Sequence, residues 1–384
     1  MISISTLYCQ APLPSHELRY GRRRAGTGPV VVYNCTARCN LKCLHCYAAA
    51  TAAGDRDELS TAEAGALLDG LARLNCPVVL FSGGEPLLRE DLPELVAHAA
   101  EVGIRPVVSS NGTLITPQVA EELAAAGAAY VGVSIDGTEQ THNRFRGDAD
   151  AFARAMAGLD NCRAAGMKVG LRMTLTRRNA SDLEAVFDLI RRREIPRACF
   201  YHLVYTGRGA DLQNEDLTHQ QRRDLLDRIM DLTAAEHAAG RQPEVLTVDN
   251  HADGPYVVLR LLREDPDRAA AALELLRANG GNASGVRLAC VRPDGDVTPD
   301  QFWPTQVLGN VRRRPFSEIW NDESIELLAG LRRRPRPLTG RCARCRWLEL
   351  CNGNFRARAE AATGETWADD PACYLTDQEV RGER

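Results

Sequence analysis

The sequence contains almost no lysine. It has 47 basic side chains among 384 residues, and only Lys42 and Lys168 are lysines. The formal net charge is −4, so no charge excess points to nucleic acid or an anionic membrane surface as a partner. A GC-rich, Ala- and Arg-rich genome explains the arginine bias most simply. The bias also suits a substrate with several carboxylates, because one guanidinium can donate two hydrogen bonds to a carboxylate.

Long apolar segments are absent as well. No run of 18 or more apolar residues occurs, so no membrane-spanning helix is predicted. The first ten residues have no charged n-region and no long apolar run, so no signal peptide is predicted. We therefore expect a cytoplasmic protein.

Cysteine, by contrast, is abundant. The chain has 13 cysteines, and most of them lie in two tight groups. In a reducing compartment disulfides are rare, and clustered cysteines are typical of metal sites. Cys9, Cys76, Cys162 and Cys199 are scattered, and we expect them to be small buried apolar residues.

Short apolar runs alternate with helical stretches from about residue 29 onward. The runs are 30–33, 78–81, 107–109, 130–134, 169–174 and 199–203, and the helical stretches are 61–74, 92–102, 117–126, 151–165 and 183–193. This pattern predicts an α/β fold with a parallel sheet, as in a partial (β/α)6 TIM-like barrel. In such barrels the functional residues follow the strands. Residues 39–46, 82–86, 110–112 and 136–137 each come directly after an apolar run.

The alternation stops after about residue 215. Residues 218–239 and 266–278 predict helices, and 286–299 predict a hairpin around Pro293-Asp294-Gly295-Asp296. We expect four parts: an N-terminal extension (1–28), a barrel (29–240), a helical connector (241–285) and a small cysteine-rich domain (286–384).

The first cysteine group has the spacing C-x3-C-x2-C. Cys39, Cys43 and Cys46 on one compact loop can hold three irons of a [4Fe–4S] cluster and leave the fourth iron open to a small molecule. A zinc loop is the alternative, with His45 or Cys35 as the fourth ligand. The spacing favours the cluster and leaves zinc open.

A Gly-Gly turn, Ser82-Gly83-Gly84-Glu85-Pro86, follows the second apolar run. Two glycines let the backbone approach a ligand closely, and Glu85 can accept a hydrogen bond from an ammonium group. Together with the cysteine group about 40 residues upstream, this turn resembles the radical SAM superfamily.

The resemblance implies that S-adenosylmethionine binds at the strand ends, where the cluster cleaves it to a carbon radical. The implied contacts are Ser82, Gly83, Gly84, Glu85 and Pro86 to the amino group, His45 to adenine, Asn111, Ser134 and Asp136 to ribose or carboxylate, and Arg172 to carboxylate. Asn111-Gly112 and Asp136-Gly137 are equally compatible with simple turns.

The second cysteine group is Cys342-x2-Cys345-x5-Cys351, with Cys373 further on. Four thiolates complete one closed site, and zinc fits that spacing as well as a cluster does. The group resembles the SPASM/Twitch extension of radical SAM enzymes, which implies an auxiliary [4Fe–4S] cluster. Cys290 matches one ligand of a second auxiliary cluster, but Asp300 and Phe355 stand where other ligands would be. We therefore expect two clusters in total, with Cys290 as a spare thiol.

Further motifs resemble the radical SAM enzymes of siroheme-derived haem synthesis. They are Tyr33-Asn34-Cys35-Thr36, the segment from His202 to Gly209, the segment from Asp249 to Gly254, the segment from Gly281 to Gly285, Gln301-Phe302-Trp303 and the segment from Cys351 to Arg356. One branch of this family removes acetate side chains of 12,18-didecarboxysiroheme to give Fe-coproporphyrin III. The other acts on propionates of the same precursor on the way to d-type haem. Residues 1–24, 201–209 and 245–256 favour the deacetylating branch. Cys351-Asn352-Gly353-Asn354 is as similar to the other branch, which stays the alternative.

Such a substrate is a flat iron tetrapyrrole with many carboxylates. It requires arginine forks and aromatic walls. The residues that suit these needs are Arg144, Arg146, Arg208, Tyr201, Phe302 and Trp303, with His202 and His251 as conceivable axial ligands of the iron. A ferredoxin- or flavodoxin-type donor is the expected electron source.

Two other functions remain in view. A SPASM enzyme that modifies peptides usually has a recognition domain before the barrel, whereas only about 28 residues precede the first apolar run here. A non-catalytic iron–sulfur carrier or zinc-binding module does not account for residues 82–86 or for the barrel-length repeat.

Overall fold

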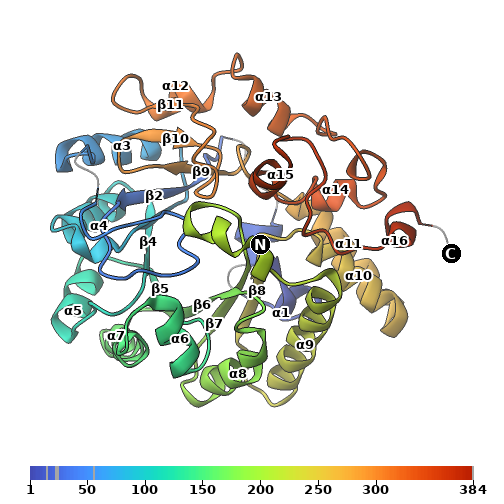
Figure 1. Cartoon of the computed structure of the whole chain (residues 1–384). Helices are drawn as coiled ribbons and strands as arrows, with labels where there is room; N and C mark the ends of the chain where they lie inside the picture. The colour runs from blue at the N-terminus through green and yellow to red at the C-terminus, as the bar shows by residue number, and fades with distance from the viewer. Residues whose placement is uncertain (14–15, 22–25, 55–56, 383–384) are drawn as a thin grey trace.

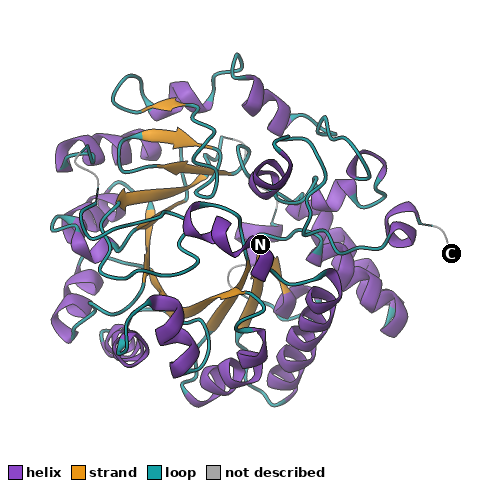
Figure 2. Ribbon diagram, in the orientation of Figure 1, coloured by secondary structure: helices purple, strands orange, loops and turns teal. Residues whose placement is uncertain are grey.

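Parallel strands form the centre of the chain, and helices alternate with them (Figures 1 and 2). The computed structural model describes residues 1–13, 16–21, 26–54 and 57–382. The parallel strands are β2 (Val30–Thr36), β3 (Val78–Gly83), β4 (Arg105–Ser110), β5 (Tyr130–Ser134), β6 (Val169–Leu175), β7 (Arg197–His202) and β8 (Glu244–Val248). All six apolar runs that predicted strands form them, as β2 to β7. Consecutive strands are neighbours in the sheet.

Helices cover the outer face of this curved sheet (Figure 2). They are α3 (Thr61–Arg73), α4 (Leu92–Glu101), α5 (Pro117–Ala125), α6 (Glu139–Arg146), α7 (Ala151–Ala164), α8 (Leu183–Arg192) and α9 (His219–Ala238). Because helices cover one face and the barrel interior the other, the strands are apolar along most of their length. The predicted helices agree to within one residue at each end, and only the short α6 was not predicted.

The predicted helical connector over 241–285 is wrong in its first part. Residues of β8 pair in parallel with β7, with Val245 opposite Ala198, so this segment adds a seventh parallel strand. The two-residue strand β1 (Ile2–Ser3) pairs antiparallel with β8 at this edge. The helices α10 (Asp253–Glu264) and α11 (Pro266–Asn279) follow, as expected of a connector.

The N-terminal segment packs beside β8. It contains α1 (Ile4–Leu7) and α2 (His16–Tyr20). Residues 14–15 and 22–25 of the predicted extension lie outside the described residues.

The C-terminal region continues the same sheet at its other edge. The strand β9 (Leu288–Val291) pairs in parallel with β2, and β10 (Asp296–Thr298) pairs antiparallel with β9, which confirms the predicted hairpin. The remaining elements are β11 (Gly309–Asn310), α12 (Phe316–Trp320), α13 (Glu326–Arg332), α14 (Leu348–Cys351), α15 (Arg356–Thr363) and α16 (Asp377–Arg381). They lie along one side of the barrel, in orange and red in Figure 1.

Over the described residues, the structure contains no helix with both the length and the apolar character needed to cross a bilayer.

Candidate active site

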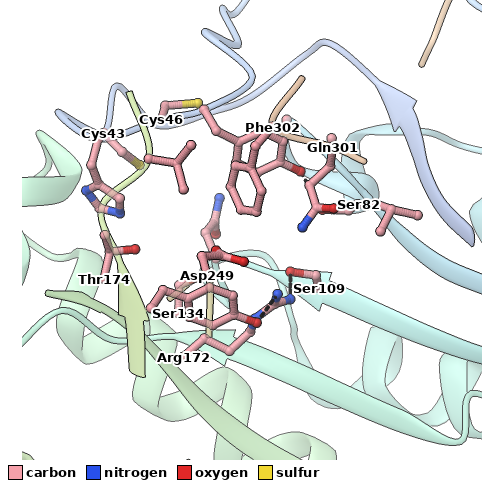
Figure 3. A pocket seen from close by; sticks show the side chains of 18 of the residues that line it. Cys43, Cys46, Ser82, Ser109, Ser134, Arg172, Thr174, Asp249, Gln301 and Phe302 are labelled. Carbon is pink, nitrogen blue, oxygen red and sulfur yellow. Dashed lines mark hydrogen bonds between the residues drawn. The ribbon is translucent and has the colours of Figure 1, made fainter. Parts of the chain in front are cut away.

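A cavity opens at the carboxyl ends of the parallel strands (Figure 3). It encloses about 1020 Å³ of space free of atoms, part of which is open to solvent. Residues from the β2–α3 loop lie on one side, including Cys43 and Cys46, while Ser134, Arg172 and Asp249 come from the strand ends. The strand-end rule therefore located this cavity correctly from the sequence.

The loop that carries the first cysteine group is held at several points along its backbone. A bridge joins Arg38 to Thr51, and the amide of Leu44 donates to the carbonyl of Phe145 at 2.9 Å. The Arg208 guanidinium donates from Nε to the carbonyl of Cys43 at 2.8 Å and from Nη1 to that of Ala50 at 2.9 Å. Arg208, predicted to bind substrate, clamps this loop through these two bonds and is not among the described residues that line the cavity.

The three thiols of the first group face a common space. Cys39 and Cys43 pack together with Leu41 and Ala50, and Cys46 packs against them. Burial and the neighbouring thiols raise the pKa of Cys39 to about 11, and burial raises that of Cys43. Buried thiolates therefore need compensating positive charge, which a bound iron–sulfur cluster would supply. The donor set fits the predicted cluster.

The Gly-Gly turn lies directly against this cysteine loop. A side chain at Gly84 would collide with the carbonyl of Arg38, and Gly83 has a φ of 122°, which side chains rarely adopt. Both glycines line the cavity, as do Ser82, Asn111, Ser134, Arg172 and His45. The turn thus requires glycine for loop packing as well as for ligand approach.

His45 is held as a neutral ring. Burial lowers its pKa to about 4, against the opposing charge of Asp136, whose Oδ1 lies 3.6 Å from Nε2. The ring also contacts Phe145, with 5.5 Å between ring centroids. A neutral, planar side chain at the cavity wall suits contact with a purine, and the predicted adenine contact stays a prediction.

Three of the predicted S-adenosylmethionine contacts lie behind the cavity wall. Glu85 is fully buried, and its oxygens accept from the Ser110 hydroxyl and the Asn111 amide, both at 2.8 Å. Pro86 starts a short 3-10 helix, and Asp136 is fully buried against Arg146. Glu85, Pro86 and Asp136 are not among the described residues that line the cavity. Their side chains fix loops and do not face the ligand space.

Arg146 connects the cavity wall to the first cysteine group. Its Nη2 lies 2.6 Å from Asp136 Oδ2, and its Nη1 donates to Cys43 Sγ at 3.5 Å. Arg146 was predicted to bind a substrate carboxylate. Arg146 lines the cavity, and its charge is paired with the buried carboxylate of Asp136. Its contact with a substrate carboxylate stays a prediction.

The other predicted substrate residues divide in two. Tyr201, His202 and Phe302 line the cavity. Arg144 lies on the exposed face of α6, and Trp303 is buried with its Nε1 donating to Glu360 at 3.0 Å. His251 is buried and, within the described chain, is not among the cavity-lining residues. The predictions for Arg144, Trp303 and His251 as substrate contacts are therefore wrong. Arg144 is exposed outside the cavity, and Trp303 and His251 are buried away from the cavity lining.

The second cysteine group comes together beside α14. The thiols of Cys342, Cys345 and Cys373 all lie near Cys351, and together with burial they raise its pKa well above the usual value. The amide of Asn354 donates to Cys351 Sγ at 3.1 Å. Four neighbouring thiols that disfavour one another's ionisation suit a cationic metal group. The predicted auxiliary cluster stays a prediction.

Cys290 lies apart from both groups. It is fully buried, and its sulfur accepts from Asn34 Nδ2 at 3.5 Å. Asp300 accepts from the amide of Phe302 at 2.9 Å, and the ring of Phe355 packs edge-on to Phe302 at 5.8 Å. Asp300 and Phe355 thus shape the loop that carries Phe302 to the cavity. Cys290 fits the predicted role of a spare buried thiol.

Sequence reasoning missed several cavity-lining residues. They are Tyr47, Ser109, Thr174, Asp249 and Gln301. Asp249 directly follows β8, so recognition of that strand would have pointed to it. Its carboxyl group is buried, and burial raises its pKa to about 7. Tyr47 donates to Asn34 and lies 3.0 Å from the hydroxyl of Ser82, and only the fold brings these residues together.

Two family profiles match the chain. The profile of the radical SAM superfamily matches residues 33–190, and the SPASM profile, described as an iron–sulfur cluster-binding domain, matches residues 284–346. These ranges include the first cysteine group, and Cys290, Cys342 and Cys345 of the C-terminal region.

Full-length relatives and solved structures agree with these matches. Fe-coproporphyrin III synthase of Methanosarcina barkeri is 53% identical, covering 99% of each chain. Pre-heme d1 synthase of Dinoroseobacter shibae is 42% identical, covering 92% of this chain and 87% of that protein. The structure of anSMEcpe with bound AdoMet has the same fold, with a TM-score of 0.67 and 18% identity over 90% of this chain and 93% of that one. The chain belongs to the radical SAM superfamily, among its members with a C-terminal iron–sulfur cluster-binding extension.

Proposed function

We propose that this radical SAM enzyme removes the acetate side chains of 12,18-didecarboxysiroheme and forms Fe-coproporphyrin III. The observation that carries this proposal is the 53% identity to Fe-coproporphyrin III synthase of Methanosarcina barkeri over 99% of both chains. The identity to the pre-heme d1 synthase is lower, at 42% over 92% of this chain.

One group of cavity-lining residues suits the cofactor, and another suits the substrate. Ser82, Gly83 and Gly84 lie beside the cysteine loop, together with Asn111, on the side assigned to S-adenosylmethionine. Bound there with a reduced [4Fe–4S] cluster at Cys39, Cys43 and Cys46, S-adenosylmethionine supplies a carbon radical. The glycines let its methionine part approach the cluster loop. Arg172 also lines the cavity and supplies a positive charge there.

Other residues of the cavity lining suit a tetrapyrrole. Phe302 and Val204 supply apolar surface, and Tyr201, Asp249 and Gln301 supply polar contacts around it. Apolar surface for the ring and polar groups for its carboxylates are what a large planar tetrapyrrole requires of a binding site. The chain contributes position and exclusion of water, because the radical reacts with whichever carbon lies closest.

The second cysteine group suits an auxiliary [4Fe–4S] cluster that passes electrons. An external one-electron donor of the ferredoxin or flavodoxin type is the proposed source. The Arg358 side chain joins the two regions, since it donates to Leu203 and Asp249 at the cavity rim and to Asp370 near Cys373.

Mass spectrometry of the tetrapyrrole tests the substrate and the reaction together. Reconstituted enzyme is incubated anaerobically with 12,18-didecarboxysiroheme, S-adenosylmethionine and dithionite. Loss of two acetate groups supports the proposal. A change at the propionates instead supports the function named for the 42% identical relative. An unaltered tetrapyrrole contradicts both.

A further inference from the structure

Two histidines, His202 and His251, were predicted as axial ligands of the substrate iron, and the structure separates them. His202 ends β7 and lines the cavity, whereas His251 is buried outside the cavity-lining set of the described chain. His202 is itself only 4% exposed. A histidine this deeply buried needs partners for both ring nitrogens, so the contacts of each nitrogen show what the ring can do.

One ring nitrogen of His202 is held by a carboxylate. Its Nε2 lies 2.9 Å from Asp253 Oδ2, and the hydroxyl of Tyr374 donates to the other oxygen of Asp253 at 2.7 Å. Burial opposes ionisation of Asp253, but His202 and these hydrogen bonds hold its pKa below the usual value. An ionised Asp253 accepts from Nε2–H, which places the proton on Nε2 and leaves a lone pair on Nδ1.

The other ring nitrogen, Nδ1, makes no hydrogen bond within the described part of the chain. His202 Nδ1 is buried and has no hydrogen-bond partner among the residues that the structure describes. Metal-binding histidines almost always donate their second N–H to a carboxylate or carbonyl, which fixes the tautomer and the ring orientation. Here that second contact exists on Nε2, and Nδ1 makes no hydrogen bond to any residue in the described part of the chain.

We infer that His202 Nδ1 is the axial ligand of the substrate iron, with Asp253 and Tyr374 fixing the ring. The identity of the ligand rests on the proposed function, which supplies an iron tetrapyrrole. Leu203 and Val204 follow His202 directly and also line the cavity, so the macrocycle face meets apolar side chains around the ligating nitrogen. Ligation at this point fixes the distance and tilt of the ring relative to the cysteine loop.

The alternative is that the His202–Asp253 pair only fastens β7 to α10. Comparison of the affinities for an iron porphyrin and for its metal-free form separates these two roles. A residue that ligates iron affects binding of the iron form only, whereas a structural residue affects both forms. The probes are Fe-coproporphyrin III and metal-free coproporphyrin III, added to reconstituted full-length enzyme. Absorption and electron paramagnetic resonance spectra of the ferric complex report the axial ligand, and titrations give both affinities.

In the wild type we expect the spectra of nitrogen-ligated ferric iron. In H202A that signature is lost, free imidazole restores it, and affinity for the iron form falls at least about tenfold. Affinity for the metal-free form stays within about twofold, since the apolar walls are intact. H251A, the matched buried histidine, keeps the wild-type spectra.

Unchanged spectra in H202A overturn the inference. Equal losses of affinity for the iron and metal-free forms overturn it too, because they indicate a structural role only. If H202A does not fold, wild-type enzyme with ¹⁵N-labelled histidine decides, since electron–nuclear double resonance detects a histidine nitrogen bound to ferric iron or its absence. Turnover of didecarboxysiroheme without histidine ligation refutes this inference alone, whereas ligation without turnover refutes the proposed function.

Discussion

Arg358 and Asp370 form an ion pair that is completely buried, with Arg358 Nε donating to Asp370 Oδ1 at 2.9 Å. The same guanidinium donates to the carbonyls of Leu203 at 3.0 Å and Asp249 at 2.8 Å. Asp370 also accepts from the amide of Ala372, next to Cys373. One side chain therefore ties the second cysteine group to the strand ends that form the cavity rim.

Replacement of Arg358 by Met leaves Asp370 charged and buried without its partner. We expect a loss of about 3–5 kcal/mol in the free energy of unfolding, because a buried carboxylate loses its compensating charge. Chemical denaturation of the apoprotein measures it. R178M breaks the exposed Arg178–Glu215 pair and should cost less than about 1 kcal/mol. Similar losses in the two variants would contradict the structural role of Arg358.

Arg146 is expected to set the reduction potential of the first cluster. R146Q removes a positive charge that donates to Cys43 Sγ, so the reduced, more negative cluster is stabilised less. Loss of one charge-assisted hydrogen bond of about 1.4 kcal/mol corresponds to a potential lower by about 60 mV for one electron. Potentiometric titration followed by electron paramagnetic resonance gives the value. R144Q, on the exposed face of the same helix, should leave it unchanged, and an unshifted R146Q would refute the assignment.

Iron content tests the number of clusters. Wild-type enzyme should bind about eight irons per chain, as two [4Fe–4S] clusters do. C373S should lower this to about four, because it removes a ligand from the second group only. C290S should retain the full content, since Cys290 contacts Asn34 and lies outside both groups. A loss of iron in C290S would instead indicate a third cluster.

Asp249 should make the free energy of unfolding fall as the pH rises. Burial raises its pKa from 3.8 to about 7, so the folded protein retains a proton that the unfolded chain releases. Between about pH 4 and 7 the wild type therefore loses stability with rising pH, by at most about 4 kcal/mol, and the loss is complete above pH 7. The amino group of Met1, Asp300, Arg358 and Arg172 also act on this carboxyl group.

D249N removes this titration. Its melting temperature relative to the wild type should rise from pH 5 to pH 7 and level off above that. D211N, at an exposed aspartate, serves as the control. A constant difference between D249N and the wild type across this range would show that Asp249 does not carry a raised pKa.

The sequence was sufficient for the barrel strands, because each is a short apolar run followed by polar or glycine residues. It was not sufficient for β8, although β7 and the long helix α9 precede this strand, because the alternation was expected to end near residue 215. Sheet pairing with β7, which no local pattern reveals, identifies this strand.

Side-chain roles were harder to predict than side-chain types. Arg144 and Arg146 are two positions apart on α6, so a helix places them on different faces, one exposed and one buried. Arg208 and Glu85 are side chains of the expected types, but partners distant in the chain use their polar atoms. The cysteine groups were predictable because their ligands are local in sequence, whereas charge pairing depends on tertiary contacts.

The most direct test of the central claim compares three products of one anaerobic reaction. Reconstituted enzyme receives 12,18-didecarboxysiroheme, S-adenosylmethionine and dithionite, and acetate, 5′-deoxyadenosine and Fe-coproporphyrin III are measured over time. We predict that each acetate released is accompanied by one 5′-deoxyadenosine, and that both reach a plateau as Fe-coproporphyrin III does. Formation of 5′-deoxyadenosine without acetate or Fe-coproporphyrin III would contradict the proposed function.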